Sequence, residues 1–390
     1  MALTVSELVQ EAAARAGQTG RANPRDIPFA ANLERLVTSA EATGRLNELG
    51  RQVLRKAALR HVRNLLDVEA YVDDHPAVAA RRLEGAIVVT GLPRTGTTLL
   101  HNLLALDPAH RALRFWEALK PVPSGPEGPP TEARQEQAER WLESFYRIVP
   151  EFRAVHHATA TGPEECDALL QNTFASQHFD DMFDAEAYSE WLAHAPLHHE
   201  YAHYALQLRI LWGASATGAA GPPTWALKSP SHLGHLDALL AALPGCRVVL
   251  CHREPRQAVA SYASLVHTLR RAYSEAASPA AAGRQALARA ATAMSRALAV
   301  RAVAGDGRFV DLSYRELVRD PVGSVRAVYR HVSCPLRPDV EEAMRDWVAA
   351  NPAGKHGPHR YDLARFELAD RDVHRAFGPY LERFGALAAG

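Results

Sequence analysis

The sequence predicts an α/β protein in which a parallel β-sheet is flanked by helices and preceded by a helical N-terminal extension. Three observations support this fold class. Short apolar runs alternate with helical stretches after residue 85, the first run is apolar on both faces, and residues 1–84 repeat apolar side chains every three to four positions. Strands that alternate with helices form parallel sheets covered on both faces, and the three-to-four spacing is that of amphipathic helices.

The elements follow in order along the chain. We expect N-terminal helices at Ser6–Ala16, Ala31–Thr43 and Leu46–Leu66. Strands are expected at Ala86–Thr90, Thr224–Lys228, Cys246–Cys251 and Arg308–Leu312, and helices at His232–Leu243 and from Arg256. The predicted division is a helical extension over 1–84 and a domain over 85–390, with a mostly helical insertion at about 110–222.

The composition excludes several classes of function. The 390 residues carry 44 Lys+Arg and 44 Asp+Glu, so the net charge gives no reason to bind nucleic acid or an anionic membrane. No apolar run approaches the roughly 18 residues of a membrane span, and Glu7 and Glu11 interrupt what would be the apolar part of a signal peptide. Four cysteines without a CxxC pair do not make a disulfide scaffold. We therefore expect a cytoplasmic protein without a membrane span or a nucleic-acid partner.

A glycine-punctuated turn follows the first predicted strand. The segment Gly91-x4-Gly96-Thr97-Thr98 leads from strand to helix, which is the frame of a phosphate-binding P-loop. A kinase or NTP hydrolase would have Lys where this chain has Thr97, whereas here the basic residue is Arg94. The sequence thus predicts a P-loop-like core whose ligand carries a 5′-phosphate rather than a long triphosphate.

The segment Pro93–Thr98 reads PRTGTT and resembles the 5′-phosphosulfate-binding loop of the sulfotransferases that use 3′-phosphoadenosine 5′-phosphosulfate (PAPS). In that family the motif reads Pro-Lys/Arg-Ser/Thr-Gly-Thr-Thr. The resemblance implies a sulfotransferase fold and PAPS as co-substrate. It also implies that the donor is bound by Arg94, Thr95, Gly96, Thr97, Thr98 and Leu99.

Further matches lie along the chain. Arg253 follows a strand and Ser261 comes eight residues later, the spacing of the family's 3′-phosphate motif, in which the two side chains form charge-assisted hydrogen bonds to one phosphate. Lys228 matches a lysine that lies near the transferring sulfuryl group, and Tyr314 matches a tyrosine that approaches the adenine. The segment with Lys355 and Arg360 occupies the place of a basic loop that contacts the 3′-phosphate.

The resemblance implies in-line, metal-free transfer of a sulfuryl group from PAPS to the hydroxyl of a small or medium-sized acceptor, with release of 3′,5′-ADP. Arg94 and Lys228 would stabilise the developing charge. Two candidates for the general base stay open. We favour His232, four residues after Lys228, over Glu117, which is similar in position to the glutamate base of protein-tyrosine sulfotransferases.

The acceptor is expected to bind between residues 110 and 222. Aromatic side chains of this region are candidate walls of its pocket, namely Trp116, Phe145, Phe152, Phe174 and Trp191. The predicted partner is thus a hydroxylated small molecule. The sequence is also compatible with a homo-oligomer.

Two other classes of function compete with this interpretation. The P-loop frame alone also fits a kinase or a nucleotide-binding protein without transferase activity. His199, Glu200 and His203 spell HExxH, the zinc-hydrolase signature, but Leu206 and Arg209 stand where the extended motif has its glycine and third histidine. Because a catalytic zinc needs three protein ligands, we expect no metal site.

Overall fold

The computed structural model describes residues 4–18, 20, 28–83, 85–125, 128–155, 158–214, 224–352 and 362–389. The chain divides into two compact units. Unit 1 comprises residues 1–83, 114–218 and 267–277, and unit 2 comprises residues 84–113, 219–266 and 278–390. The N-terminal helices therefore share a unit with most of the segment predicted as an insertion.

Unit 1 is helical in its described part. Its α-helices are α1 (Val5–Arg15), α2 (Ala30–Thr43), α3 (Glu48–Asp74), α5 (Phe115–Leu119), α6 (Thr131–Ile148), α7 (Phe152–Val155), α8 (Asp167–Leu170), α9 (Gln177–Phe183), α10 (Glu186–His194) and α11 (His198–Ala214), with short 3-10 turns η3 (Pro76–Val78) and η4 (Gln171–Thr173). The helices predicted in the first 84 residues are confirmed, and the third extends eight residues beyond its predicted end at Leu66. α1 packs along α3 because Leu8, Val9 and Ala12 form a buried apolar face.

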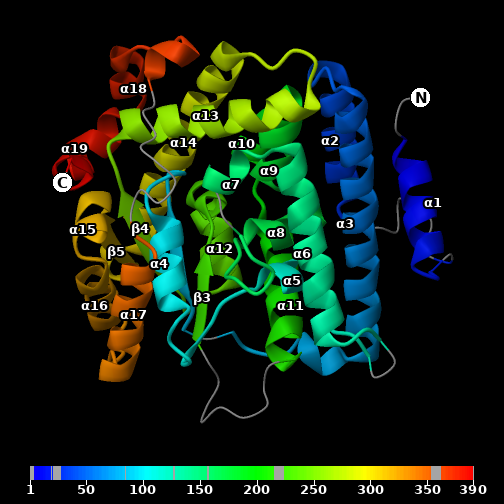
Figure 1. Ribbon diagram of the computed structural model, residues 1–390, viewed down its shortest axis with the longest axis horizontal. Helices are drawn as coiled ribbons and strands as arrows, with labels where there is room; N and C mark the ends of the chain where they lie inside the picture. The colour runs from blue at the N-terminus through cyan, green and yellow to red at the C-terminus, as the bar shows by residue number, and fades with distance from the viewer. Residues whose placement is uncertain are drawn as a thin grey trace. The chain divides into compact units, whose positions relative to one another are not determined.

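Unit 2 is built on a five-stranded parallel sheet (Figure 1). Its strands are β1 (Ile87–Gly91), β2 (His110–Arg111), β3 (Thr224–Lys228), β4 (Arg247–His252) and β5 (Phe309–Ser313). The strand order is β2-β3-β1-β4-β5, so the chain order reverses on either side of β1. Open parallel sheets bind ligands beyond the carboxyl ends of their strands at such a reversal. The predicted α/β class with a parallel sheet is confirmed.

Helices complete unit 2. They are α4 (Thr97–Leu104), α12 (Leu236–Ala242), α13 (Pro255–Tyr273, which continues into unit 1), α14 (Pro279–Ala304), α15 (Tyr314–Arg319), α16 (Pro321–His331), α17 (Pro338–Ala350), α18 (Asp370–Ala376) and α19 (Gly378–Ala389), with 3-10 turns η5 (Pro230–His235), η6 (Asp306–Arg308) and η7 (Leu363–Phe366). Figure 1 shows α15, α16 and α17 grouped beside the sheet.

Alternation along the strands divides the sheet's side chains between two faces. One face carries Ile87, Val89, Val249 and Leu312 and packs on buried residues of α4, α15, α16 and α17. Each such aliphatic side chain contributes about 1.5–3 kcal/mol when it is fully buried. The opposite face carries His252, which follows Cys251 in β4, and Asp311, which precedes Leu312 in β5. Polar groups on that face need hydrogen-bond partners.

The helix predicted at His232–Leu243 differs in its first part. The chain forms a 3-10 turn, η5, over Pro230–His235 before α12 begins at Leu236. Pro230 occupies the first position of the turn, and the Ser229 hydroxyl accepts the Ser231 N–H at 3.2 Å. Proline at a first position and a serine cap both start a helical turn early, so the turn begins two residues before the predicted start.

Candidate active site at the carboxyl edge of the sheet

The carboxyl edge of the sheet is the edge at which β1, β3, β4 and β5 end. The loop from β1 to α4 lies there and depends on glycine at two positions. A Cβ atom on Gly91 would lie 2.5 Å from the carbonyl oxygen of Cys251, and Gly91 has a φ of +152°. Gly96 caps α4 with a φ of +83°, and a Cβ there would lie 2.9 Å from Leu317 Cδ2. Other residues would therefore displace the loop.

Side chains of the same loop are held in place. Thr95 is fully buried and its hydroxyl donates to the carbonyl of Leu92 at 2.8 Å. Arg94 adopts a φ of +71°, which is uncommon for a residue with a side chain. Such backbone strain is often found at ligand-binding loops. Thr97, Thr98 and Leu99 form the first turn of α4. The N–H groups of a first turn have no acceptors within the helix. The loop therefore offers an anion hydrogen-bond donors and the positive end of the helix dipole.

Lys228 ends β3 and points to this loop. Lys228 pairs with Val89 of β1 and therefore lies beside the strand that leads into the loop. The side chain is only 2% exposed, and Nζ donates to Thr98 Oγ1 at 3.4 Å. The structure thus brings together the lysine and the phosphate-loop threonine that the sequence analysis had linked only through motifs.

Arg253 leaves the end of β4 and reaches the same loop. Its guanidinium donates to the carbonyl of Arg94 at 2.6 Å and lies over the ring of Tyr314, with 4.2 Å from Cζ to the ring centroid. A Cβ on Gly96 would come within 3.1 Å of the same tyrosine ring. Arg94, Gly96, Arg253 and Tyr314 are therefore neighbours, although up to 220 positions separate them in the chain.

Ser261 lies on α13, two turns beyond Arg253. Gln257, whose side-chain oxygen accepts from Arg253 at 3.2 Å, precedes Ser261 by four residues, so both face the same side of the helix. Ser261 is 2% exposed, and its hydroxyl has no hydrogen-bond partner within the described ranges. A buried hydroxyl without a partner is costly and is the kind of group that a ligand oxygen satisfies.

The two candidate bases differ in their surroundings. His232 lies in η5 of unit 2 and is fully buried. Its neighbour His235 is also buried, and desolvation, followed by Arg296 and His232, lowers the pKa of His235 to about 3. Glu117 lies in α5 of unit 1, where its carboxylate accepts the N–H of Arg114, the N-cap residue, at 3.0 Å. That contact is a common structural role for an acidic residue in a first helical turn.

Two other residues predicted to bind the donor, Lys355 and Arg360, lie outside the described residues. Within unit 1, Trp116, Phe145 and Phe152 are partly buried in one cluster with Phe115. Phe174 is fully buried and belongs to the core, and the guanidinium of Arg35 lies 5.3 Å from the ring of Trp191.

The HExxH segment takes part in helix packing. Glu200 accepts from Asn32 of α2 at 2.9 Å, and His203 Nδ1 contacts the Gln207 amide at 3.1 Å, while His199 is exposed. Burial lowers the pKa of His203 to about 4. In the part of the chain that the structure describes, no group of three or more His, Cys, Asp or Glu is arranged to hold a metal ion. The motif therefore has a structural explanation.

Three polar residues next to the site were not indicated by any sequence motif. His252, which directly precedes Arg253, contacts Asp311 and Tyr380. One signal was available, because Asp311 interrupts the apolar strand Phe309–Leu312, and a carboxylate in a buried strand requires a partner.

Comparisons with known proteins match the chain to one family and to two solved structures over nearly its whole length. The family described as "Sulfotransferase family" matches residues 86–338. No curated protein matches the chain. No helix in the described ranges is both long and apolar enough to cross a membrane.

Two solved structures are similar over nearly the whole chain. Sulfotransferase STF1 from Mycobacterium tuberculosis H37Rv is 28% identical, with a TM-score of 0.79, over 97% of this chain and 99% of that one. Sulfotransferase STF9 from Mycobacterium avium is 27% identical, with a TM-score of 0.82, over 98% of this chain and 96% of that one.

Proposed function

The chain belongs to the sulfotransferase family, and we propose that it transfers a sulfuryl group from PAPS to a hydroxyl of a small or medium-sized acceptor. The observation that supports this most strongly is the convergence of the 91–98 loop, Lys228 and Arg253 at one sheet edge. When bound, PAPS would supply a sulfuryl group on a phosphate leaving group, for in-line transfer that releases 3′,5′-ADP without a covalent enzyme intermediate or a metal.

The residues present fit this donor. The 91–98 loop presents helix N–H groups around glycines that tolerate no Cβ atom, which suits the 5′-phosphosulfate. Arg253 and the unpartnered Ser261 hydroxyl would hold the 3′-phosphate. Tyr314, already stacked on Arg253, would border the adenine.

Arg94 and Lys228 have the proposed role of preorganised donors. A lysine that is 2% exposed and fixed beside Thr98 needs little reorganisation when negative charge develops near it. Charge stabilisation of this kind is usually the largest single contribution to catalysis. In this proposal the lysine acts on the transferring group, whereas Arg253 acts mainly in binding.

The proton of the acceptor hydroxyl needs a base within hydrogen-bond reach. We assign this role to His232, because it belongs to the same unit as Lys228 and follows it by four residues. Glu117 is the second candidate. The variants Glu117→Gln and His232→Ala, assayed at saturating PAPS on an aliphatic alcohol acceptor, separate the two. Near-wild-type rates in both would exclude both residues.

Calorimetry tests the donor specificity without knowledge of the acceptor. We expect 3′,5′-ADP to bind more tightly than ADP or ATP, and binding to be independent of magnesium. Magnesium-dependent ATP binding without a preference for the 3′-phosphate would instead favour a kinase. A screen of hydroxylated compounds with labelled PAPS then identifies the acceptor, and a protein that binds 3′,5′-ADP but labels no compound would be a binding module.

A further inference from the structure

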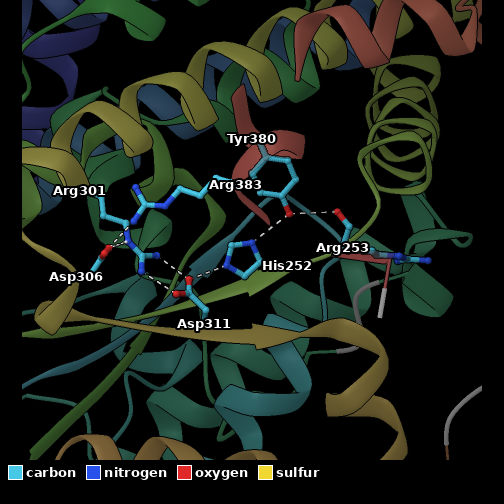
Figure 2. Close-up of polar contacts among 7 residues, drawn as sticks. All are labelled: His252, Arg253, Arg301, Asp306, Asp311, Tyr380 and Arg383. Carbon is cyan, nitrogen blue, oxygen red and sulfur yellow. Dashed lines mark hydrogen bonds and ion pairs between the residues drawn. The ribbon is translucent and has the colours of Figure 1, made fainter. Parts of the chain in front are cut away.

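A largely buried chain of polar contacts lies behind Arg253 in unit 2 (Figure 2). Asp311 accepts two hydrogen bonds from the guanidinium of Arg301, at 2.6 and 2.7 Å. Its Oδ1 also lies 2.8 Å from His252 Nε2. Burial by itself would raise the pKa of Asp311, but the hydrogen bonds from His252 and Arg301 outweigh it and lower the pKa to about 2. The carboxylate is therefore charged, and Nε2 of His252 carries the proton that it accepts.

The second nitrogen of His252 extends the chain to the C-terminal helix. Nδ1 lies 3.1 Å from the hydroxyl of Tyr380 in α19, and the two rings stack at 5.7 Å and 14°. The Tyr380 hydroxyl also lies 3.5 Å from the carbonyl oxygen of Arg253. Figure 2 shows the His252 ring between Asp311 and Tyr380, with the Arg253 carbonyl beyond the hydroxyl. Burial raises the pKa of Tyr380, so the hydroxyl keeps the single proton that it donates to the Arg253 carbonyl.

These contacts hold the main chain on both sides of the Arg253 Cα atom. The His252 side chain is anchored to β5 through Asp311, and the Arg253 carbonyl faces the hydroxyl from α19. From this Cα atom the Arg253 side chain runs to the Arg94 carbonyl and to the Tyr314 ring. Contacts that restrain the backbone where the arginine leaves β4 lower the entropy cost of ordering this segment when a ligand binds.

We propose that Asp311, His252 and Tyr380 are positioning residues that fix the main chain at Arg253 and so aim its guanidinium at the 3′-phosphate of the nucleotide. This inference rests on the proposed function. It makes α19, a helix close to the end of the chain, part of the nucleotide-binding machinery, although Tyr380 acts through Arg253.

The Tyr380→Phe variant tests the proposal, because it removes one hydroxyl and keeps the stacked ring. Calorimetry on the full chain compares 3′,5′-ADP with adenosine 5′-monophosphate (5′-AMP), which lacks only the 3′-phosphate. In the wild type we expect tighter binding of 3′,5′-ADP. In the variant we expect the preference to fall roughly five- to tenfold, the effect of about one hydrogen bond, while the affinity for 5′-AMP stays unchanged.

Phe384→Leu is the matched control. Phe384 belongs to the same helix and packs on the same His252 ring at 4.5 Å, but it has no polar atom. This variant should lower the melting temperature and keep the nucleotide preference. Asp311→Asn, which weakens the anchor at the other end of the chain, should reduce the preference as Tyr380→Phe does, and it decides the question if Tyr380→Phe does not fold.

The outcomes distinguish a failure of the proposed 3′-phosphate site from a failure of the positioning role alone. A wild type that binds 3′,5′-ADP and 5′-AMP equally well would overturn the proposed 3′-phosphate site and the positioning role with it. A wild type with the preference and a folded Tyr380→Phe that retains it in full would overturn the positioning role alone. Equal loss of the preference in Phe384→Leu would likewise overturn it, because packing would then explain the effect.

Discussion

Replacing Asp311 by Asn should destabilise the protein by an amount that depends on pH. Asp311 accepts from Arg301 and from His252, two side chains that are 5% and 0% exposed. The amide of asparagine keeps the shape but not the charge, so a buried guanidinium loses its bidentate partner. Removing one member of a buried pair is strongly destabilising, and the carboxylate that remains on Arg301, that of Asp306, is 65% exposed.

The pKa of Asp311 sets the magnitude. Its fall from the ordinary value of 3.8 to about 2 corresponds to about 2 kcal/mol of unfolding free energy at neutral pH. Because the folded-state pKa is the lower one, this stabilisation is present above the unfolded value and is lost as the pH falls through the folded value. At pH 3 roughly half of it should remain. The wild type should therefore exceed Asp311→Asn by at least about 2 kcal/mol at pH 7, with a smaller difference at pH 3.

Denaturant unfolding of both proteins at pH 7 and pH 3 measures these differences. Asp306→Asn is the control, because Asp306 also accepts from Arg301, at 2.6 Å, but is 65% exposed. Exposed pairs contribute little, so this variant should stay close to the wild type at both pH values. A pH-independent deficit in Asp311→Asn, or an equal deficit in Asp306→Asn, would show that the charge of Asp311 does not provide the stability.

Two further predictions concern Lys228 and the cysteines. Lys228→Met should lower sulfuryl transfer to an acceptor from the screen by about 10²–10³, with 3′,5′-ADP affinity changed far less, and a turnover equal to the wild type would refute its role. Burial raises the pKa of the Cys246 and Cys251 thiols to about 11 and 12, so at pH 8 an alkylating reagent should label the partly exposed Cys334 first. Mass spectrometry of the native protein after brief labelling checks the order, and earlier labelling of either buried thiol would contradict it.

Much of the site was predictable because of one property of parallel sheets. The carboxyl ends of all strands lie at the same edge, so motifs that directly follow different strands must come close together. Lys228 ends β3, and Arg253 follows β4 by one residue. The strand predictions were within one residue of the observed bounds, which was sufficient to place both side chains at the 91–98 loop.

Short and irregular elements could not be predicted in the same way. β2 contains only His110 and Arg111, which have no apolar periodicity, and it forms because the chain pairs with β3 at Thr224 and Trp225. Tertiary pairing, rather than local preference, determines such a strand. The 3-10 turn η5 depends on the local chemistry of Ser229 and Pro230, which the apolar pattern does not report.

The contacts behind Arg253 were also beyond sequence reasoning, for a different reason. His252 meets Asp311 across 59 positions and Tyr380 across 128. No periodicity links such distant residues, and each alone has an ordinary interpretation: a histidine at a strand end, a carboxylate in a strand, an aromatic residue in a terminal helix. Only the pairing of β4 with β5 and the packing of α19 against both strands bring them together.

The general base is the least predictable residue, and the physical reason lies in how such residues are recognised. Motif spacing finds groups that bind a phosphate, because the fold fixes where phosphate loops lie. A base is defined instead by its reach to an acceptor oxygen, which depends on the acceptor's own position. Glu117 is satisfied as a helix cap and His232 is fully buried, so each residue also has a structural explanation for its place. Substitution of both, with the acceptor in hand, is therefore the measurement that assigns the base.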